Sequence, residues 1–217
     1  MIRTAAFGLT ALALAASAAN ASIAFSFADP VPGQQLSLTA GLLTYDTTAP
    51  INFIVDGTGE GYGSTNFANA RLSASLVIGL ATSLGGGDFV APVTGTFTFT
   101  NAANGNTILS AIAGAGAFVR ISNTGSLLFS SDNGLSYIAG IELTSFLPAG
   151  VALVPAEEAV FTVTDLTVNN GGPQVVLGVV QDFTANTSYS GNSAVIPTPG
   201  AMALLGLGGV VAGRRRR

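Results

Sequence analysis

The sequence lacks histidine, cysteine and lysine, three side chains on which many catalytic and metal sites depend. All seven of its basic residues are arginine. A Ser-His-Asp triad, a Cys-His dyad and a His-ligated zinc site are therefore excluded. Without lysine, the chain also lacks the amine needed for a Schiff base, a Ser-Lys dyad or a Lys-Asn isopeptide crosslink.

Two acidic patterns remain as candidates. Glu157 and Glu158 are adjacent, so on a strand they would face opposite sides and could not form the carboxylate pair of a glycosidase. We expect a solvated loop there. Asp132-Asn133-Gly134 offers oxygen ligands for calcium but lacks the later bidentate Glu of known calcium loops, which favours a plain turn. The sequence thus predicts no catalytic residue, no cofactor and no metal site.

A glycine-rich stretch, Gly57-Thr-Gly-Glu-Gly-Tyr-Gly63, superficially resembles a phosphate-binding loop. Such a loop needs a helix start after it and a lysine to serve the phosphates. Neither is present, and the stretch is expected to be an ordinary loop between strands.

The N-terminus has the three parts of a secretory signal peptide. Arg3 gives the positive region, Ala5–Ala16 the short apolar region, and Ala19-Asn20-Ala21 the small-x-small pattern that signal peptidase requires. We predict that residues 1–21 form a signal peptide helix and that cleavage falls between Ala21 and Ser22. The absence of a twin arginine indicates the general secretion route.

The C-terminus joins a proline motif, an apolar run and a basic end. Pro197, Thr198, Pro199 and Gly200 precede the uncharged run 201–213, and the chain ends on Arg214, Arg215, Arg216 and Arg217. A helix over 199–213 would rise about 22 Å, whereas the hydrocarbon core is about 30 Å thick. The arginines would stay in the cytoplasm. These features indicate that the tail is held only transiently in the inner membrane. The alternative is that the tail is kept as a membrane anchor.

In this order of parts the tail resembles the PEP-CTERM sorting signal of bacterial exosortase substrates. Thr198 stands where that family typically has Glu. The resemblance implies recognition by an exosortase-like enzyme in the membrane, cleavage near the motif, and release or attachment at the cell surface. Such proteins are usually tied to exopolysaccharide and biofilm.

Without its two ends the chain is strongly acidic. The whole sequence has 7 basic and 11 acidic residues. Removing Arg3 and the four terminal arginines leaves Arg71 and Arg120 against all 11 acids, a net charge of −9. A body with this charge should avoid nucleic acid and anionic lipid, and should stay soluble.

The segments between the ends predict an all-β fold. Short alternating apolar runs are separated by Gly, Asn, Asp and Pro, and helical periodicity is nearly absent. The clearest strand is Val93–Thr100, with Phe97 and Phe99 inward. We expect a hairpin around Asp132–Gly134 and a bulge near Asp165, where the alternation slips. The predicted architecture is one β-sandwich or jelly-roll-like domain over residues 22–185, followed by a polar linker over 186–196.

These features favour a non-enzymatic protein that is exported to the cell surface or extracellular matrix. Its expected partners are signal peptidase, the sorting enzyme and, transiently, the inner membrane. The alternative is a carbohydrate-binding module that tethers the cell to polysaccharide. Sugar sites usually stack a ring on an exposed aromatic, and with no Trp in the chain the best candidate is Tyr62, in the glycine-rich loop.

Overall fold

The computed structural model describes residues 21–28, 33–46, 49–149, 151–169 and 174–197. The predicted signal peptide, apart from Ala21, and the predicted tail beyond Pro197 lie outside these residues. The described part is almost entirely β-structure, which confirms the all-β class. Its one α-helix is the short α1 (Ile141–Phe146).

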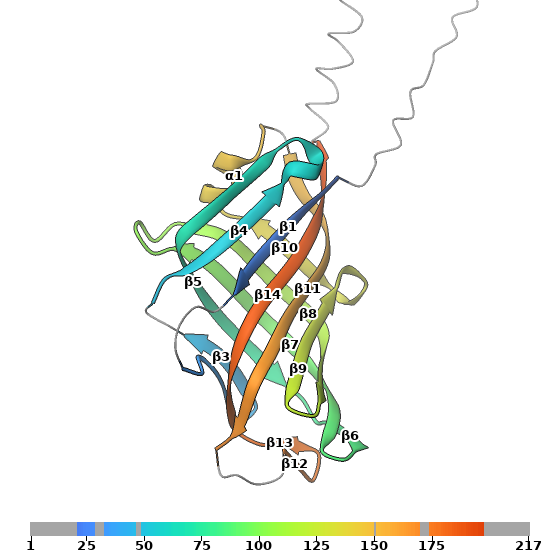
Figure 1. The fold of residues 1–217 in the computed structure, drawn as a ribbon. Coiled ribbons are helices and arrows are strands. Elements are labelled where there is room, and N and C mark those ends of the chain that lie inside the picture. The colour runs from blue at the N-terminus through green and yellow to red at the C-terminus, as the bar shows by residue number, and fades with distance from the viewer. Residues whose placement is uncertain (1–20, 29–32, 47–48, 150, 170–173, 198–217) are drawn as a thin grey trace, which may run out of the picture.

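Fourteen strands and two short 3-10 turns accompany this helix in the described residues (Figure 1). The first seven strands are β1 (Ala21–Ala28), β2 (Leu36–Thr39), β3 (Leu42–Asp46), β4 (Ile51–Gly57), β5 (Gly63–Ile78), β6 (Thr82–Gly85) and β7 (Asp88–Asn101). The remainder are β8 (Thr107–Ile121), β9 (Thr124–Ser130), β10 (Leu135–Ala139), β11 (Val151–Val168), β12 (Val175–Val176), β13 (Val179–Val180) and β14 (Phe183–Pro197). The 3-10 turns are η1 (Thr58–Glu60) and η2 (Ser131–Asn133).

The main sheet closes on itself. From β14 the pairing runs through β11, β9, β8, β7, β5 and β4 to β1, and β1 pairs back with β14. Every pairing along this path is antiparallel. Closure matters physically because it leaves these strands without exposed backbone edges.

Three long strands make closure feasible, since each pairs with two shorter strands in succession. On one side of β5, residues 63–70 pair with β4 and residues 73–77 with β3. On β14, residues 183–185 pair with β2 and residues 188–195 with β1. On β8, residues 109–113 pair with β10 and residues 116–121 with β9.

Aromatic rings from many strands meet in the core. Phe99 stacks on Phe53 with ring centroids 4.0 Å apart, and Phe97 meets Phe161 edge to face at 5.0 Å. Tyr189 on β14 contacts both Phe97 and Phe99. The predicted inward position of Phe97 and Phe99 is confirmed, since both are buried. Burying each such ring contributes roughly 1.5–3 kcal/mol.

The largest correction concerns residues 186–196, expected as a polar linker. They form most of β14, which pairs with β11 along one edge and with β1 along the other. The segment looked like a linker because several of its inward positions are small or polar, including Thr187, Gly191 and Ser193. Backbone pairing on both sides holds the segment in the sheet without a row of large apolar side chains.

The Asp132–Gly134 turn forms, but the expected hairpin around it is wrong. Strands β9 and β10 flank the turn, and each pairs with β8 and not with the other. The fifteen residues of β8 are long enough to receive both. The predicted bulge near Asp165 is confirmed, because the β11–β14 register shifts between Thr164 and Thr167.

Candidate functional site

The two predicted processing sites border the same end of the closed sheet. Ala21 is the first residue of β1 and Pro197 the last residue of β14. The two strands are antiparallel neighbours, and Ala21 pairs with Val195. Of the other predicted site residues, Ser22 lies in β1, while Ala19, Thr198, Pro199, Gly200 and the arginines 214–217 lie outside the described residues.

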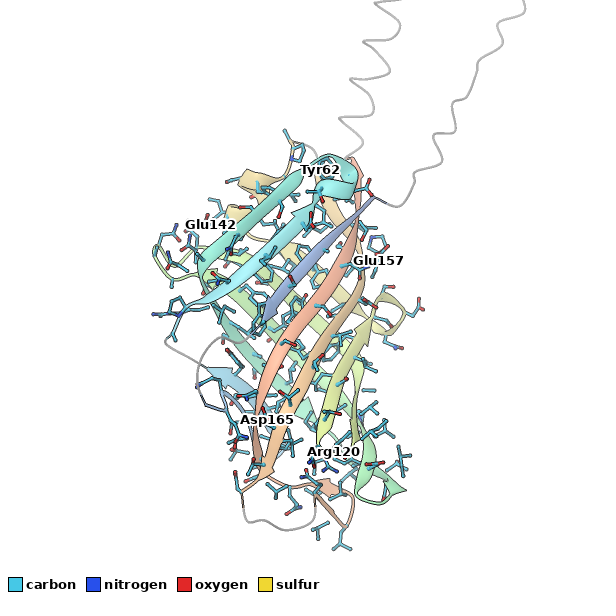
Figure 2. The ribbon with its side chains drawn as sticks, viewed as in Figure 1. Tyr62, Arg120, Glu142, Glu157 and Asp165 are labelled. Carbon is cyan, nitrogen blue, oxygen red and sulfur yellow. The ribbon has the colours of Figure 1, made fainter. Side chains whose placement is uncertain are left out.

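Two carboxylates face the start of β1. The backbone N–H of Ser22 donates to Oε1 of Glu60 at 3.4 Å, and its hydroxyl donates to Oε2 of Glu157 at 3.2 Å. Asn192 on β14 donates its amide to the same Glu157 oxygen at 2.6 Å. Figure 2 shows Glu157 and Tyr62 toward this end. The arrangement can accept a positive charge at the Ser22 nitrogen, since carboxylates bind charged donors more strongly than neutral ones.

The solvated loop expected at Glu157 and Glu158 is wrong, because both residues lie in strand β11. Together with Asn133 they line one surface hollow of about 460 Å³. Its other walls include Gly116, Leu128 and Phe129. The Glu157 carboxylate is already engaged by Ser22 and Asn192, and Glu158 is exposed. Across the described residues, no group of three Asp or Glu side chains gathers closely enough to hold a metal ion.

The glycine-rich stretch 57–63 forms the connection between β4 and β5 through η1. The hydroxyl of Thr58 donates to Oδ1 of Asp56 at 2.6 Å and its backbone N–H does so at 2.9 Å. These two bonds lower the pKa of Asp56. The carboxylate therefore stabilises the turn from within, and the stretch is a loop between strands as expected.

Tyr62 does not offer the open ring that sugar stacking requires. It is half-buried and packs against the core. The other three tyrosines are buried, as are most phenylalanines in the described residues, and Phe67 and Phe146 are half-buried. Within the described part of the chain, the aromatic rings are thus buried in the core or packed against it.

A carboxylate that sequence reasoning passed over anchors α1. Oε1 of Glu142 accepts amide hydrogens from Asn104 at 2.6 Å, Asn106 at 3.2 Å and Asn101 at 3.3 Å. The bonds from Asn104 and Asn106 are the main causes that lower the pKa of Glu142. This cluster ties the helix to the β7–β8 turn, and Figure 2 shows Glu142 at the surface there.

A pocket around Arg120 was not predicted from the sequence. A cavity of about 580 Å³ is lined by Arg120, Asp88 and Gln174, together with residues of β6 and of the β12–β13 hairpin. A signal was available in the sequence. Arg120 follows Phe118 by two positions on one strand, so period-two alternation places both side chains on the inward face, and both are buried.

In the part of the chain that the structure describes, no helix combines the length and apolar character needed to cross a bilayer. Comparisons with protein-family models, curated proteins and solved structures found no match to this chain.

Proposed function

We propose that this chain is an exported, non-enzymatic protein of the cell surface or extracellular matrix. Signal peptidase removes residues 1–21, and an exosortase-like enzyme recognises the PEP-CTERM-like tail that begins at Pro197. The inner membrane holds the tail transiently, and the processed body is associated with exopolysaccharide or biofilm.

The observation that carries this proposal is the fit between the folded body and the two processing sites. The sheet begins at Ala21 and ends at Pro197, on neighbouring strands. Both predicted cleavages therefore fall at the ends of the described residues, and neither would remove a described core strand.

The surroundings of Ser22 give a second line of support. Cleavage after Ala21 turns the Ser22 nitrogen into an ammonium group. That nitrogen already lies 3.4 Å from a carboxylate oxygen of Glu60, and the Ser22 hydroxyl reaches Glu157. The new N-terminus would thus lie beside two carboxylates. Its ammonium group would form a surface ion pair with Glu60, which contributes about 0.2–1 kcal/mol.

The same proposal includes a sandwich-like or jelly-roll-like packing of the closed sheet into two facing layers. Contacts between strands that are not neighbours support it. Phe97 of β7 meets Phe161 of β11, and Phe25 of β1 meets Tyr137 of β10 at 5.4 Å. A scaffold of this kind can present surface loops at both ends, as a structural or binding protein requires.

The test is the intact mass of the protein recovered from the native cell surface. We expect a chain that starts at Ser22 and ends near Pro197–Gly200. Retention of Arg217 would refute the sorting step and leave a membrane anchor as the better account. Retention of residues 1–21 would refute the export step.

The second candidate function is a carbohydrate-binding module. The half-buried state of Tyr62 argues against the usual aromatic platform, whereas the pocket around Arg120 offers a polar alternative. A glycan array distinguishes a carbohydrate-binding module from a structural surface protein. Failure to bind any acidic or neutral polysaccharide would exclude the module.

A further inference from the structure

Arg120 is a buried cation whose hydrogen-bonding capacity is largely unused. Its side chain is 7% exposed, and Nη1 donates to the backbone oxygen of Gly87 at 2.6 Å. Its Nε is enclosed and has no hydrogen-bond partner in the described structure. Burying an arginine without a counter-charge is costly, so its place in the wall of a pocket calls for an explanation.

A second unsatisfied group lies in the same pocket. Oε1 of Gln174 is buried and accepts no hydrogen bond from any described residue. Asp88 also lines the cavity, with Oδ1 accepting the backbone N–H of Ser122 at 2.8 Å. The pocket therefore combines a cationic donor, a neutral acceptor and a carboxylate, beside the apolar side chains of Val175 and Leu177.

These groups are complementary to a molecule that carries both a carboxylate and hydroxyl groups. We propose that the pocket binds a uronic acid unit, with its carboxylate on the Arg120 guanidinium and its hydroxyl groups on Gln174 and Asp88. Guanidinium groups suit planar carboxylates in particular. The carboxylate would supply the missing counter-charge, and a hydroxyl would donate to the unsatisfied Gln174 oxygen.

The charges of the pocket disfavour other ligands. A phosphate dianion would place two negative charges against one guanidinium, beside the Asp88 carboxylate, so its second negative charge would be unmatched. A metal cation would be repelled by Arg120. A neutral sugar would leave the guanidinium without an anion.

The β12–β13 hairpin forms part of the wall of the pocket around Arg120. It forms a separate two-stranded sheet with only two residue pairs, and Ala81 donates a backbone hydrogen bond to Gly178 in its turn. The backbone N–H of Gln181 also donates to the Gln174 backbone oxygen at 2.8 Å, and a local shift of this short hairpin would open the enclosed guanidinium to a ligand. The hairpin and β6 lie at the end of the molecule opposite the start of β1 (Figure 1), and Figure 2 shows Arg120 there.

This position suits a polymer ligand, if the body is attached or released at the surface as proposed above. The end that carries Ser22 and Pro197 would face the membrane during processing, and the Arg120 pocket would face away from it. The inference that the uronic acid belongs to a polymer rests on that proposed function. The inference that the pocket binds a uronic acid unit does not.

The test is calorimetric titration of the full purified chain with glucuronate, an oligoglucuronate, glucose and inorganic phosphate. We expect the uronates to bind and glucose and phosphate not to bind. Arg120→Gln should weaken uronate binding about tenfold or more, the loss expected for a charge-assisted hydrogen bond. Arg71→Gln is the matched control, because Arg71 is the other arginine of the body and is exposed on β5. It should bind as the unchanged chain does.

Binding of the oligomer but not the monomer, lost in Arg120→Gln, would support a polymer ligand. Equal uronate binding by Arg120→Gln and the unchanged chain would overturn the proposal, as would equal binding of phosphate or no uronate binding at all. If Arg120→Gln does not fold, Gln174→Leu replaces it and should also weaken uronate binding. None of these results alters the intact mass, so failure here is distinguishable from failure of the processing scheme.

Discussion

At the scale of single residues, two buried tyrosines are tightly constrained by their hydrogen bonds and by a glycine that packs against them. The hydroxyls of Tyr137 and Tyr189 lie 2.8 Å apart, and that of Tyr137 also donates to the backbone oxygen of Glu158 at 2.6 Å. Burial raises the pKa of both phenols, so both stay protonated. Gly191 lies beneath them, where a Cβ would come within 2.4 Å of the Tyr189 oxygen and 2.5 Å of the Tyr137 oxygen. Only glycine leaves room for the pair.

The direction of these bonds predicts unequal effects for two similar substitutions. Since the Tyr137 hydrogen goes to Glu158, Tyr189 must donate to the Tyr137 oxygen. Tyr189→Phe removes one hydrogen bond and should cost about 0.5–1.5 kcal/mol. Tyr137→Phe leaves the buried Tyr189 hydroxyl without its partner and should cost about 1–3 kcal/mol. Urea unfolding of both variants measures the difference, and a larger loss for Tyr189→Phe would contradict this assignment.

At the scale of elements, β14 decides the architecture. Its central residues pair with β1 and β11 at once, as Ser190 does with Ser26 and Val160. Two inward polar side chains are satisfied within the sheet. Thr187 donates to the Thr162 backbone oxygen at 3.0 Å, and Ser193 donates to that of Pro155 at 3.2 Å. A strand can therefore be central while it has the composition of a linker.

Proline substitution distinguishes a central strand from a linker. Ser190→Pro removes a ladder donor between two neighbouring strands, and each buried group left unpaired costs about 1–3 kcal/mol. Steric conflict with the paired backbones adds to this, so we expect most of a typical stability of about 5–15 kcal/mol to be lost. Loss of the cooperative thermal transition, followed by circular dichroism, is the expected result.

Thr82→Pro is the matched control, because Thr82 is the first residue of β6, which lies at the end of the strand order. Proline is tolerated at such positions, so this variant should remain folded. If Ser190→Pro unfolded no more readily than Thr82→Pro, the central position of β14 would be wrong.

At the scale of the whole molecule, the pairing of β1 with β14 joins the two ends of the fold. The eight register pairs run from Ala21 with Val195 to Ala28 with Ser188. An N-terminal strand paired over its full length with the C-terminal strand means that the sheet cannot close until the chain is complete. Folding of the body should therefore follow export of its last strand.

A disulfide between these strands tests the closure, and the chain has no cysteine that would interfere. Ser26 and Ser190 are register partners, and facing Cα atoms in antiparallel pairs are about 4.5–5.5 Å apart, within disulfide range. Ser26→Cys with Ser190→Cys should oxidise spontaneously. Closing a loop of about 100 residues with a disulfide stabilises a fold by about 4.7 kcal/mol. The loop between these two positions is longer, so the crosslink should stabilise the fold by several kcal/mol.

The control pair for this experiment is Ser26→Cys with Ser188→Cys, which is two residues out of register. Diagonal neighbours at that offset are about 7–8 Å apart, so they should crosslink poorly. Mass spectrometry under non-reducing conditions reports both results, and equal crosslinking of the two pairs would contradict the register.

The sequence by itself determined the all-β class and excluded imidazole, thiol and lysine chemistry. These conclusions depend on composition and on alternation along short segments, such as the Phe97 and Phe99 pattern, which a single strand displays without its neighbours. The Asp165 bulge was predictable for the same reason, because a bulge shifts the local alternation.

Only the tertiary structure decided which strands meet. The contacts of Ser22 reach Glu60 and Glu157, which are 38 and 135 residues away in sequence. The role of β14 depends on two neighbours that pair with it from distant parts of the chain. The pocket around Arg120 likewise includes a hairpin more than fifty residues later. Such pairings are set by the total burial and hydrogen bonding of the closed sheet, a free energy that no local segment expresses.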